Sequence, residues 1–317
     1  MNIFKEILDA EKRIRPYILK TPLIESRNLS ELIGGNVYLK LESEQYTGSF
    51  KARGSLNKLL SLTENEKNRG TITASTGNHA LGYARALEIV NVKGTVYLPE
   101  NASKSKVAAL NNYSVDLKFH GFDCLTTELY AKEKAKEQNK VWVSPYNDPQ
   151  IIGGQGTIGI ELAEQLNDFD DTLITMGGGG LMSGIGTYLK KCKPVIRLVG
   201  CQPENSPEMT LSLKAGKIVE LREEIETLSD GSAGGVEKGA ITFPICQSVV
   251  DETVLVSEQE IESALKFVAH NHQKIIEGAA GVAVASLIKN KELYKERTVV
   301  IIICGSNIDI KKFKRII

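Results

Sequence analysis

The chain has 317 residues, of which 42% are hydrophobic and 25% charged, the balance of an ordinary globular protein with room for two domains or one large α/β unit. The formal net charge is zero, so no electrostatic argument supports nucleic acid or an anionic membrane as a partner. No apolar run reaches the roughly 18 residues that a membrane span needs, and the N-terminus lacks a signal-peptide core, so we expect a cytoplasmic protein.

The cysteines form neither a Cys-x-x-Cys pair nor another spacing typical of metal ligands. We interpret them as reduced thiols that mostly pack in the core: Cys124, Cys192, Cys201, Cys246 and Cys304.

Short β-rich runs alternate with helical segments in the first half of the chain. Apolar residues at helical spacing predict an opening helix over residues 3–15. Further helices are predicted from about Ser49, from about Gly77 and over residues 125–138. The predicted strands cover residues 37–41, 71–74, 95–98, 115–119 and 141–143.

The same alternation continues in the second half, where strands are predicted at residues 172–176, 195–199 and 298–303. Ser257 and Glu260 have the spacing of a capping box, in which a hydroxyl and a carboxylate bond to free backbone N–H groups at a helix start. The unbroken apolar run 298–303 is typical of a central parallel strand covered on both faces. The alternation predicts an α/β fold with doubly wound sheets, whose ligand sites lie at the carboxyl ends of the strands.

The first candidate site is residues 47–54, with the sequence Thr-Gly-Ser-Phe-Lys-Ala-Arg-Gly. A lysine in the first turn of a helix lies near unpaired backbone N–H groups, and this positive environment with partial burial would lower the pKa of Lys51. The neutral amine could then form a Schiff base. A single lysine is more often an ordinary surface residue, and the neighbouring sequence is what favours a site.

The second candidate is the run of four glycines at residues 177–180, between a predicted strand and a helix. Such a loop can turn successive N–H groups toward an anion, with help from the helix dipole. No Lys or Arg lies within the loop, so the amides alone would bind a phosphate. The alternative is a dinucleotide fingerprint, which needs an acidic residue about 20 residues further on. Glu204 is roughly placed for that role, but its Pro-flanked surroundings indicate a loop.

Two further motifs follow predicted strands. One consists of Ser75, Thr76, Gly77, Asn78 and His79. It combines hydroxyls, an amide and a helix start, which suits the binding of a carboxylate or a phenolic oxygen. A plain capping turn would have the same composition. The other is Cys-Gly-Ser-Asn, which begins at Cys304 directly after the last predicted strand, where a cysteine could also simply pack in the core.

Taken in order, these four motifs resemble those of the fold type II pyridoxal-phosphate enzymes, most closely the serine/threonine dehydratase and serine racemase family. The resemblance covers nearly the whole chain and includes residues 145–149, 154–157 and 277–280. The sister branch that makes cysteine typically has Asp-Arg after the lysine, whereas Ala52 and Arg53 follow here, which favours the dehydratase side.

The resemblance implies an α/β fold of two doubly wound open-sheet domains, as in the β subunit of tryptophan synthase. A large cofactor-binding domain would comprise residues 1–69 and 146–317, and a small mobile domain residues 70–145. The chain ends at Ile317, shortly after the last motif, so we expect no regulatory domain of the kind that some biosynthetic threonine dehydratases carry.

The resemblance also implies a role for each matched residue. Lys51 would hold pyridoxal phosphate in a Schiff base and act with Thr76 in catalysis. The residues implied to bind the cofactor are Phe50 on the ring face, Asn78 at the phenolic oxygen, Cys304 at the pyridine nitrogen, and Gly177, Gly178, Gly179, Gly180 and Leu181 at the phosphate. The substrate carboxylate would be received by Ser75, Thr76, Gly77, Asn78 and His79.

The implied reaction is the elimination of water from a small β-hydroxy amino acid, L-threonine or L-serine, to give a 2-oxo acid and ammonia. Three alternatives stay open: a racemase, a β-replacement enzyme and a non-catalytic dinucleotide-binding protein. Thr76 keeps the racemase open, since a hydroxyl on the face opposite the lysine could return a proton.

The resemblance leaves two other ligands to consider. The family's divalent-cation site falls at residues 202–208, where Glu208 is a candidate metal ligand, but Gln202 stands where an acidic residue is commoner. As a partner, a second copy of the chain is expected, because members of the family are commonly homodimers.

Overall fold

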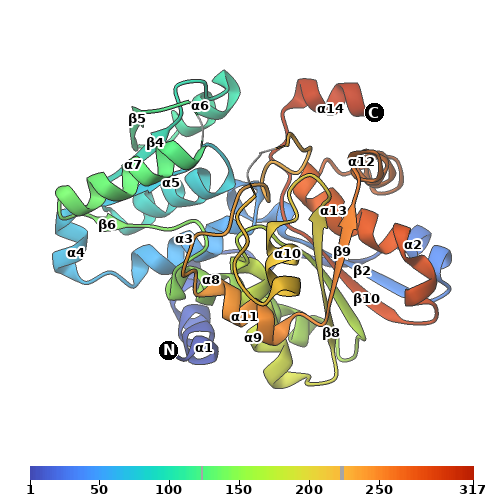
Figure 1. Ribbon diagram of the computed structural model, residues 1–317. Helices are drawn as coiled ribbons and strands as arrows, with labels where there is room; N and C mark the ends of the chain where they lie inside the picture. The colour runs from blue at the N-terminus through green and yellow to red at the C-terminus, as the bar shows by residue number, and fades with distance from the viewer. Residues whose placement is uncertain (123, 222–224) are drawn as a thin grey trace.

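The structure, a computed structural model, describes residues 1–122, 124–221 and 225–317, without the side chains of Cys124 and Leu125. Two β-sheets with surrounding helices lie beside each other (Figure 1). The smaller sheet is built from the middle of the first half of the chain, and the larger one from the segments before and after it.

The larger sheet has six strands in the order β1-β2-β10-β7-β8-β9. Their bounds are β1 Leu23–Glu25, β2 Asn36–Leu41, β10 Thr298–Ile303, β7 Asp171–Thr175, β8 Arg197–Pro203 and β9 Glu252–Val256. Only the edge pair β1 and β2 is antiparallel among the described strand pairs of this sheet. The central strand β10 is fully buried from Val299 to Ile303, so both of its faces are covered, as its apolar run predicts.

The smaller sheet has four parallel strands in the order β5-β4-β3-β6. Their bounds are β5 Asp116–Phe119, β4 Gly94–Leu98, β3 Thr71–Ala74 and β6 Val141–Trp142. The inner strands β3 and β4 are buried along almost their whole length, whereas the edge strand β5 is largely exposed.

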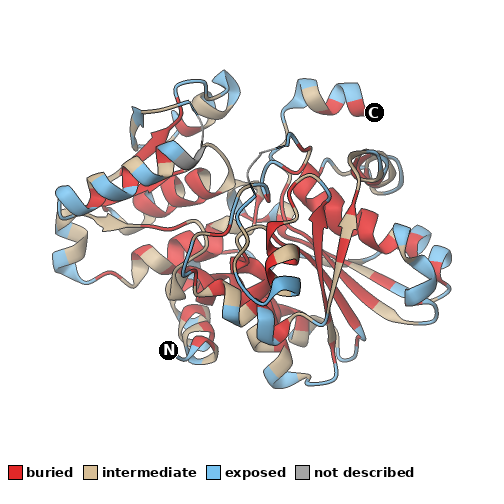
Figure 2. Ribbon diagram, viewed as in Figure 1, coloured by how far each residue is buried: buried red, intermediate tan, exposed pale blue. Residues whose placement is uncertain are grey.

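Helices cover both sheets. Their bounds are α1 Ile3–Ile14, α2 Arg27–Ile33, α3 Lys51–Leu60, α4 Glu64–Arg69, α5 Asn78–Val90, α6 Lys104–Leu110, α7 Cys124–Glu137, α8 Pro149–Gln165, α9 Gly180–Cys192, α10 Glu208–Ala215, α11 Thr242–Val249, α12 Glu258–His272, α13 Gly278–Lys289 and α14 Ile310–Ile316. The buried helix α13 packs against β7, β8, β9 and β10, and α12 packs on its outer side. The helix α8 contacts α1, α3 and α9, so it connects the helices that surround the two sheets. The buried core of the protein is coloured red in Figure 2.

Most of the predicted elements are confirmed, and so is the capping box, in which Ser257 and Glu260 bond reciprocally at the start of α12. The predicted strand at residues 195–199 was wrong at its start. Val195 is 97% exposed, and β8 begins only at Arg197, where pairing with Asp171 starts. The two preceding residues belong to the turn that follows α9, closed by the hydrogen bond from the N–H of Ile196 to the carbonyl of Lys193.

Cys201, Cys246 and Cys304 are buried free thiols, as expected for core cysteines, while Cys192 is exposed. The side chain of the remaining cysteine, Cys124, lies outside the described part of the structure. In the described segments, no helix has both the length and the apolar character required to cross a bilayer.

Candidate active site

A cavity of about 710 Å³ lies where β3, β7 and β10 end. Ser75 follows β3 directly, Gly177 comes two residues after β7, and Cys304 follows β10, and all three line the cavity. This is the location expected for a ligand site in open α/β sheets, and it brings the four sequence motifs together from both sheets.

Lys51 is the first residue of α3 and lines the cavity. Its Nζ donates a hydrogen bond to the carbonyl of Pro145 at 2.7 Å and lies 5.3 Å from the centre of the Phe50 ring. Burial lowers the pKa of the Lys51 amine to about 8, while Cys304 and Glu128 act in the opposite direction. The pKa of Lys51 is therefore lowered as expected, but burial rather than a positive environment is the cause.

The backbone just before Lys51 is tied to the end of β10. The N–H of Phe50 donates to the carbonyl of Cys304 at 3.1 Å, and Ser49 forms an isolated antiparallel bridge with Gly305. These contacts place the lysine motif and the Cys-Gly-Ser-Asn motif side by side, although they lie at opposite ends of the chain.

The four glycines form the turn between β7 and the first residue of α9, and three of them have no room for a side chain. A Cβ atom on Gly177 would lie 2.7 Å from the carbonyl oxygen of Ser232. A Cβ atom on Gly178 would lie 2.5 Å from the Tyr146 ring. Gly179 has φ of +84°, which side chains rarely allow, and a Cβ atom there would meet Met209 and Cys246. Only glycine can keep this backbone close to the cavity wall.

This turn presents free hydrogen-bond donors to the cavity. Among the described residues, none accepts a hydrogen bond from the backbone N–H groups of Gly178 to Met182. They occupy the N-terminus of the 13-residue helix α9, where the helix dipole also favours negative charge. The arrangement is that of an anion site built from backbone amides, and Leu181 lines it from the first turn.

The turn from Ser75 to Gly77 enters the N-terminus of α5 and also lines the cavity. The Ser75 hydroxyl accepts a hydrogen bond from the N–H of Gly77 at 3.2 Å. The Thr76 hydroxyl has no hydrogen-bond partner in the described part of the chain, so it is available to a ligand. A Cβ atom on Gly77 would meet nothing within 4 Å, so crowding does not require glycine there.

The His79 ring is directed into the protein. Its Nε2 lies 3.0 Å from the Thr73 hydroxyl and 3.3 Å from the carbonyl of Val143, and its Nδ1 lies 3.4 Å from the Ser55 hydroxyl. Burial, followed by the charge of Lys51, lowers the pKa of His79 to about 3, so the ring is neutral. Any contact between His79 and a ligand would therefore come from its backbone.

The orientation of the Asn78 amide is fixed by two neighbours. Its Nδ2 donates to Glu277 at 2.8 Å, and its Oδ1 accepts from Nδ2 of Asn307 at 2.7 Å. Glu277 also accepts from the backbone N–H of Asn307 at 3.1 Å. Because an amide nitrogen carries two hydrogens, one N–H of Asn78 stays available to a ligand.

Glu277 lines the cavity and was not among the predicted site residues. It is buried, and this burial raises the pKa of its carboxyl to about 7. It is the N-cap residue of α13, but its side chain makes no capping hydrogen bond and glutamate is not a preferred N-cap residue, so no capping signal in the sequence points to it. Tyr146 was missed as well; its ring packs on the glycine turn and its hydroxyl accepts from the N–H of Glu237 at 2.8 Å.

Cys304 is buried at the floor of the cavity, and burial raises its pKa well above the ordinary value. The nearby carboxyl of Glu277 acts in the same direction. Its thiol is therefore neutral at physiological pH.

The predicted metal ligand Glu208 is buried and lines the cavity, where it accepts a hydrogen bond from the Ser206 hydroxyl at 2.7 Å. Within residues 1–122, 124–221 and 225–317, no three His, Cys, Asp or Glu side chains are grouped to hold a metal. The neighbouring Gln202 uses its amide for hydrogen bonds to the backbone. These donors do not fit a divalent cation, which prefers several oxygen ligands.

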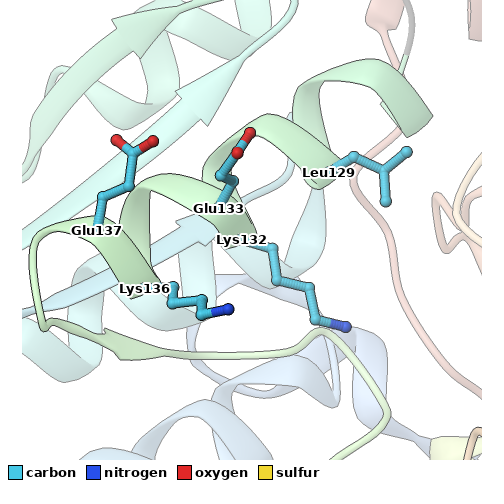
Figure 3. A pocket seen from close by; sticks show the side chains of 5 residues that line it. All are labelled: Leu129, Lys132, Glu133, Lys136 and Glu137. Atoms are coloured by element: carbon cyan, nitrogen blue, oxygen red, sulfur yellow. The ribbon is translucent and has the colours of Figure 1, made fainter.

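A second cavity, of about 500 Å³, lies along α7 (Figure 3). All of its lining residues come from this helix: Leu129, Lys132, Glu133, Lys136 and Glu137. It brings together no residues from different elements, and Leu129 and Lys132 also lie at the rim of the large cavity.

The large cavity fits pyridoxal phosphate on its own chemistry. A lysine amine of lowered pKa, an anion site made of free N–H groups, an aromatic ring and an amide with a free donor face one space. The dinucleotide alternative would require an acidic residue near the glycine turn, but Glu204 is exposed and pairs with Lys289 at 3.4 Å.

The comparisons with known proteins agree with a pyridoxal-phosphate site. A family model for "Pyridoxal-phosphate dependent enzyme" matches residues 14–305. The catabolic L-threonine dehydratase of Escherichia coli (strain K12) is 38% identical over 313 residues, covering 98% of this chain and 94% of that protein.

Two solved structures extend the likeness to the fold. The processed form of threonine deaminase isoform 2 from Solanum lycopersicum has a TM-score of 0.94 at 33% identity, covering 99% of this chain and 92% of that one. Serine racemase from Dictyostelium discoideum has a TM-score of 0.89 at 34% identity, covering 97% of this chain and 99% of that one. The fold type II architecture predicted from the sequence is confirmed. The chain belongs to the family of pyridoxal-phosphate-dependent enzymes.

Proposed function

We propose that this protein is an ammonia-lyase of amino-acid metabolism that dehydrates and deaminates a small β-hydroxy amino acid, L-threonine or L-serine or both. The products would be a 2-oxo acid and ammonia. The observation that carries the proposal is the convergence of the Lys51 amine, the glycine turn and the Ser75–Asn78 loop on one cavity. The relatives named as threonine dehydratase and threonine deaminase support it.

We place pyridoxal phosphate with its phosphate on the N–H groups at the start of α9 and its ring beside Phe50. The free N–H of Asn78 would meet the phenolic oxygen, and Cys304 the pyridine nitrogen. When bound, the cofactor supplies an electron sink for the charge that develops at the substrate Cα. The neutral thiol of Cys304 cannot form a strong ion pair with a protonated ring nitrogen, which favours prompt elimination of the β-hydroxyl.

Lys51 would remove the proton from Cα once the substrate amine has displaced it. With a pKa of about 8, roughly one amine in ten is already neutral at pH 7, compared with fewer than one in a thousand for an ordinary lysine. Proton transfer by a positioned side chain typically accelerates a reaction by about 100- to 10,000-fold relative to the same reaction without that group.

The substrate carboxylate would lie at the N-terminus of α5. In the described part of the chain, the backbone N–H groups of Asn78, His79 and Ala80 donate to no other residue, and they are joined there by the hydroxyls of Ser75 and Thr76. This combination of dipole, amides and hydroxyls suits a carboxylate. The turn thereby orients the substrate with Cα toward the lysine.

We propose that residues 70–145 act as a small mobile domain that closes over the substrate and excludes water. Side chains that meet across the cavity mouth support this: Lys106 pairs with Asp230 at 2.9 Å and Lys132 with Glu237 at 2.7 Å. Trp142, the single tryptophan, lies in β6 of this segment and can report on closure. Substrate addition should change energy transfer from Trp142 to the bound cofactor, and unchanged fluorescence would contradict closure.

The second candidate function is the racemisation of serine or another amino acid. It is favoured by the free Thr76 hydroxyl and by the similarity to a serine racemase. Thr76→Ala should leave dehydration within a few-fold and abolish any conversion of L- to D-amino acid. Production of D-amino acid at a rate equal to that of the 2-oxo acid would favour this candidate.

We further propose that the protein works as a cytoplasmic homodimer. The described free cysteines fit a reducing compartment, and the exposed side chains of Tyr17, Leu19 and Tyr46 are candidates for burial by a second copy. Light scattering on the purified protein would measure the assembly, and a monomer at micromolar concentration would overturn it.

The decisive test is to reconstitute the protein with pyridoxal phosphate, record its visible spectrum and assay 2-oxo acid and ammonia with L-threonine and L-serine. A cofactor band that is reduced by borohydride onto Lys51, located by mass spectrometry of the peptide, tests the cofactor without reference to activity. Product release then tests the reaction. A labelled Lys51 without product would retain the cofactor assignment and overturn the dehydratase proposal.

A further inference from the structure

A buried glutamine stands at the position where the resemblance places a carboxylate ligand of a divalent cation. Gln202 is 1% exposed and lies near the end of β8. Its Nε2 donates to the carbonyl of Ser206 at 3.2 Å, and its Oε1 accepts from the N–H of Thr210 at 2.7 Å. The side chain therefore bridges the turn at residues 203–207 and the first turn of α10.

The two partners fix which way this amide points. The backbone N–H of Thr210 can only donate and the carbonyl of Ser206 can only accept, so a flipped amide would lose both hydrogen bonds. The Gln202 NH₂ group thus occupies the side of the turn that faces the Ser206 carbonyl. A metal ion bound to that carbonyl would have to displace a hydrogen-bond donor.

The turn held by Gln202 supports the wall of the active-site cavity. The Ser206 hydroxyl donates to Glu208 at 2.7 Å and accepts from the N–H of Gly234 at 3.3 Å, and both Glu208 and Gly234 line the cavity. The adjacent Met209 lies so close to Gly179 that a Cβ atom there would be 2.8 Å from its methyl group. The position of this turn therefore bears on the phosphate-binding glycines.

We propose that Gln202 is a positioning residue that replaces a divalent cation. Its N–H holds the Ser206 carbonyl as a cation would, so the protein needs no divalent cation for stability or for cofactor retention. The same geometry implies that Gln202→Glu creates a cation site. One oxygen of the new carboxylate would keep the hydrogen bond from the Thr210 N–H, and the other would face the Ser206 carbonyl beside Glu208. These three groups would bring negatively charged or partly negative oxygen atoms together, which repel one another unless a cation or a proton lies between them.

The test compares thermal midpoints and cofactor retention of the holoenzyme in EDTA with those in Mg²⁺, Ca²⁺ or Mn²⁺ chloride at matched ionic strength. The wild type should show the same values in both conditions. In EDTA at pH 8, Q202E should have a lower thermal midpoint than the wild type. A divalent cation at about 100 times its dissociation constant should raise the midpoint of Q202E by about 4 °C. A proton should replace the cation, so the deficit should also shrink at pH 5.

Three control variants separate this proposal from general destabilisation. Gln202→Met removes both hydrogen bonds without adding charge and should lower the midpoint with no response to cations. The double variant Q202E/E208Q should lose most of the response, and Gln138→Glu adds the same charge at an exposed position and should show none.

Two results would overturn the proposal. The first is a wild type that loses stability or cofactor in EDTA and recovers it with a divalent cation. The second is a Q202E protein whose midpoint moves no more than that of Q138E, or which cannot be folded with cation or at low pH. Because thermal midpoints do not depend on the reaction catalysed, neither result would bear on the proposed dehydratase activity.

Discussion

Asn78 and Glu277 are 199 positions apart in the sequence, yet the amide of Asn78 donates a hydrogen bond to the buried carboxylate of Glu277 at 2.8 Å. The carboxylate also accepts the backbone N–H of Asn307, so it joins the loop after β3 to the loop after β10. Both loops carry residues that we assign to the cofactor. Together with the direct hydrogen bond from Asn307 to Asn78, Glu277 thus joins the two sheets at one site.

The raised pKa of Glu277 predicts a pH-dependent stability. With a pKa of about 7 against an ordinary 4.5, the folded protein keeps a proton that the unfolded chain has lost, so stability falls as pH rises from about 4.5 to about 7 and stays low above that. The difference amounts to about 3 kcal/mol. Urea unfolding of the cofactor-free protein measures the free energy of unfolding at pH 5 and at pH 8. The decrease in this free energy from pH 5 to pH 8 should be smaller for Glu277→Gln than for the wild type.

Glu292→Gln, at an exposed position, is the matched control for Glu277 and should keep the wild-type pH dependence. Parallel pH profiles for the wild type and E277Q would show that Glu277 has an ordinary pKa, contrary to its burial.

Lys51 should destabilise the cofactor-free protein, because it is a base whose folded pKa of about 8 lies below its ordinary 10.5. The folded state bears the full cost of burying the ammonium below pH 8, and that cost disappears as pH rises from 8 to 10.5. Lys51→Met should therefore be more stable than the wild type by about 1–3 kcal/mol at pH 7, with the difference shrinking toward pH 10. Chemical unfolding across this pH range measures it.

Lys311→Met, at an exposed position, should leave stability nearly unchanged and so controls for the substitution itself. K51M should also show no covalent cofactor after borohydride reduction. A K51M protein less stable than the wild type at pH 7 would mean that the hydrogen bond to Pro145 outweighs the desolvation of the amine.

The sequence predicts the strands and the loops that carry the site, because three of the four motifs directly follow a run of apolar or β-branched residues and the lysine motif follows such a run after a short loop. The helix α8 was not predicted. It contains Gly153, Gly154, Gly156 and Gly159, and glycine lowers helix propensity. The reason for these glycines appears only in three dimensions: a Cβ atom on Gly154 would lie 2.6 Å from the backbone of Gly54, so α8 and α3 pack too closely for side chains.

The roles of Glu277 and Gln202 could not be predicted from the sequence for a related reason. Each depends on which partner its side chain meets, and those partners come from the ends of other strands or from the next turn. The family resemblance identifies Gln202 as a departure from an acidic position, but only the two backbone partners show which way its amide points.

Gly178→Ala should weaken cofactor binding, because the added methyl group would lie 2.5 Å from the Tyr146 ring and push the turn away from the phosphate. We expect the dissociation constant of pyridoxal phosphate to rise by about 10-fold or more, equivalent to at least about 1.4 kcal/mol. Titration of the cofactor-free protein, followed by absorbance or fluorescence quenching, measures this.

Gly235→Ala is the matched control, since Gly235 lines the same cavity but its added methyl group would meet nothing within 4 Å. The double variant G178A/Y146A should recover part of the affinity by removing the ring. If G178A and G235A bind the cofactor equally well, the glycine turn does not set the phosphate site.

Arg53, two residues after Lys51, anchors the far side of α3 through a buried ion cluster. Its guanidinium donates to Glu42 at 2.7 and 2.8 Å and to Glu161 at 2.7 and 3.0 Å, and all three side chains are fully buried. Although burial opposes it, Arg53 and Lys40 lower the pKa of Glu161 to about 2. Glu161 therefore stays charged, and removal of Arg53 would leave it paired with Lys40 and with the partly exposed Arg15, whose Nη2 lies 2.8 Å from its carboxylate. Glu42, in contrast, would lose both of its hydrogen bonds to the guanidinium of Arg53.

Arg53→Met should destabilise the protein by about 3–5 kcal/mol, the usual result of breaking a buried ion pair from one side. The double variant E42Q/R53M should recover part of this loss, because it also removes the charge of Glu42, which has lost its guanidinium partner. Arg27→Met, at an exposed position, should change stability little. If R53M and E42Q/R53M unfold at the same urea concentration, the loss comes from packing around α3 rather than from uncompensated charge, and the proposed electrostatic anchoring of the lysine helix would be wrong.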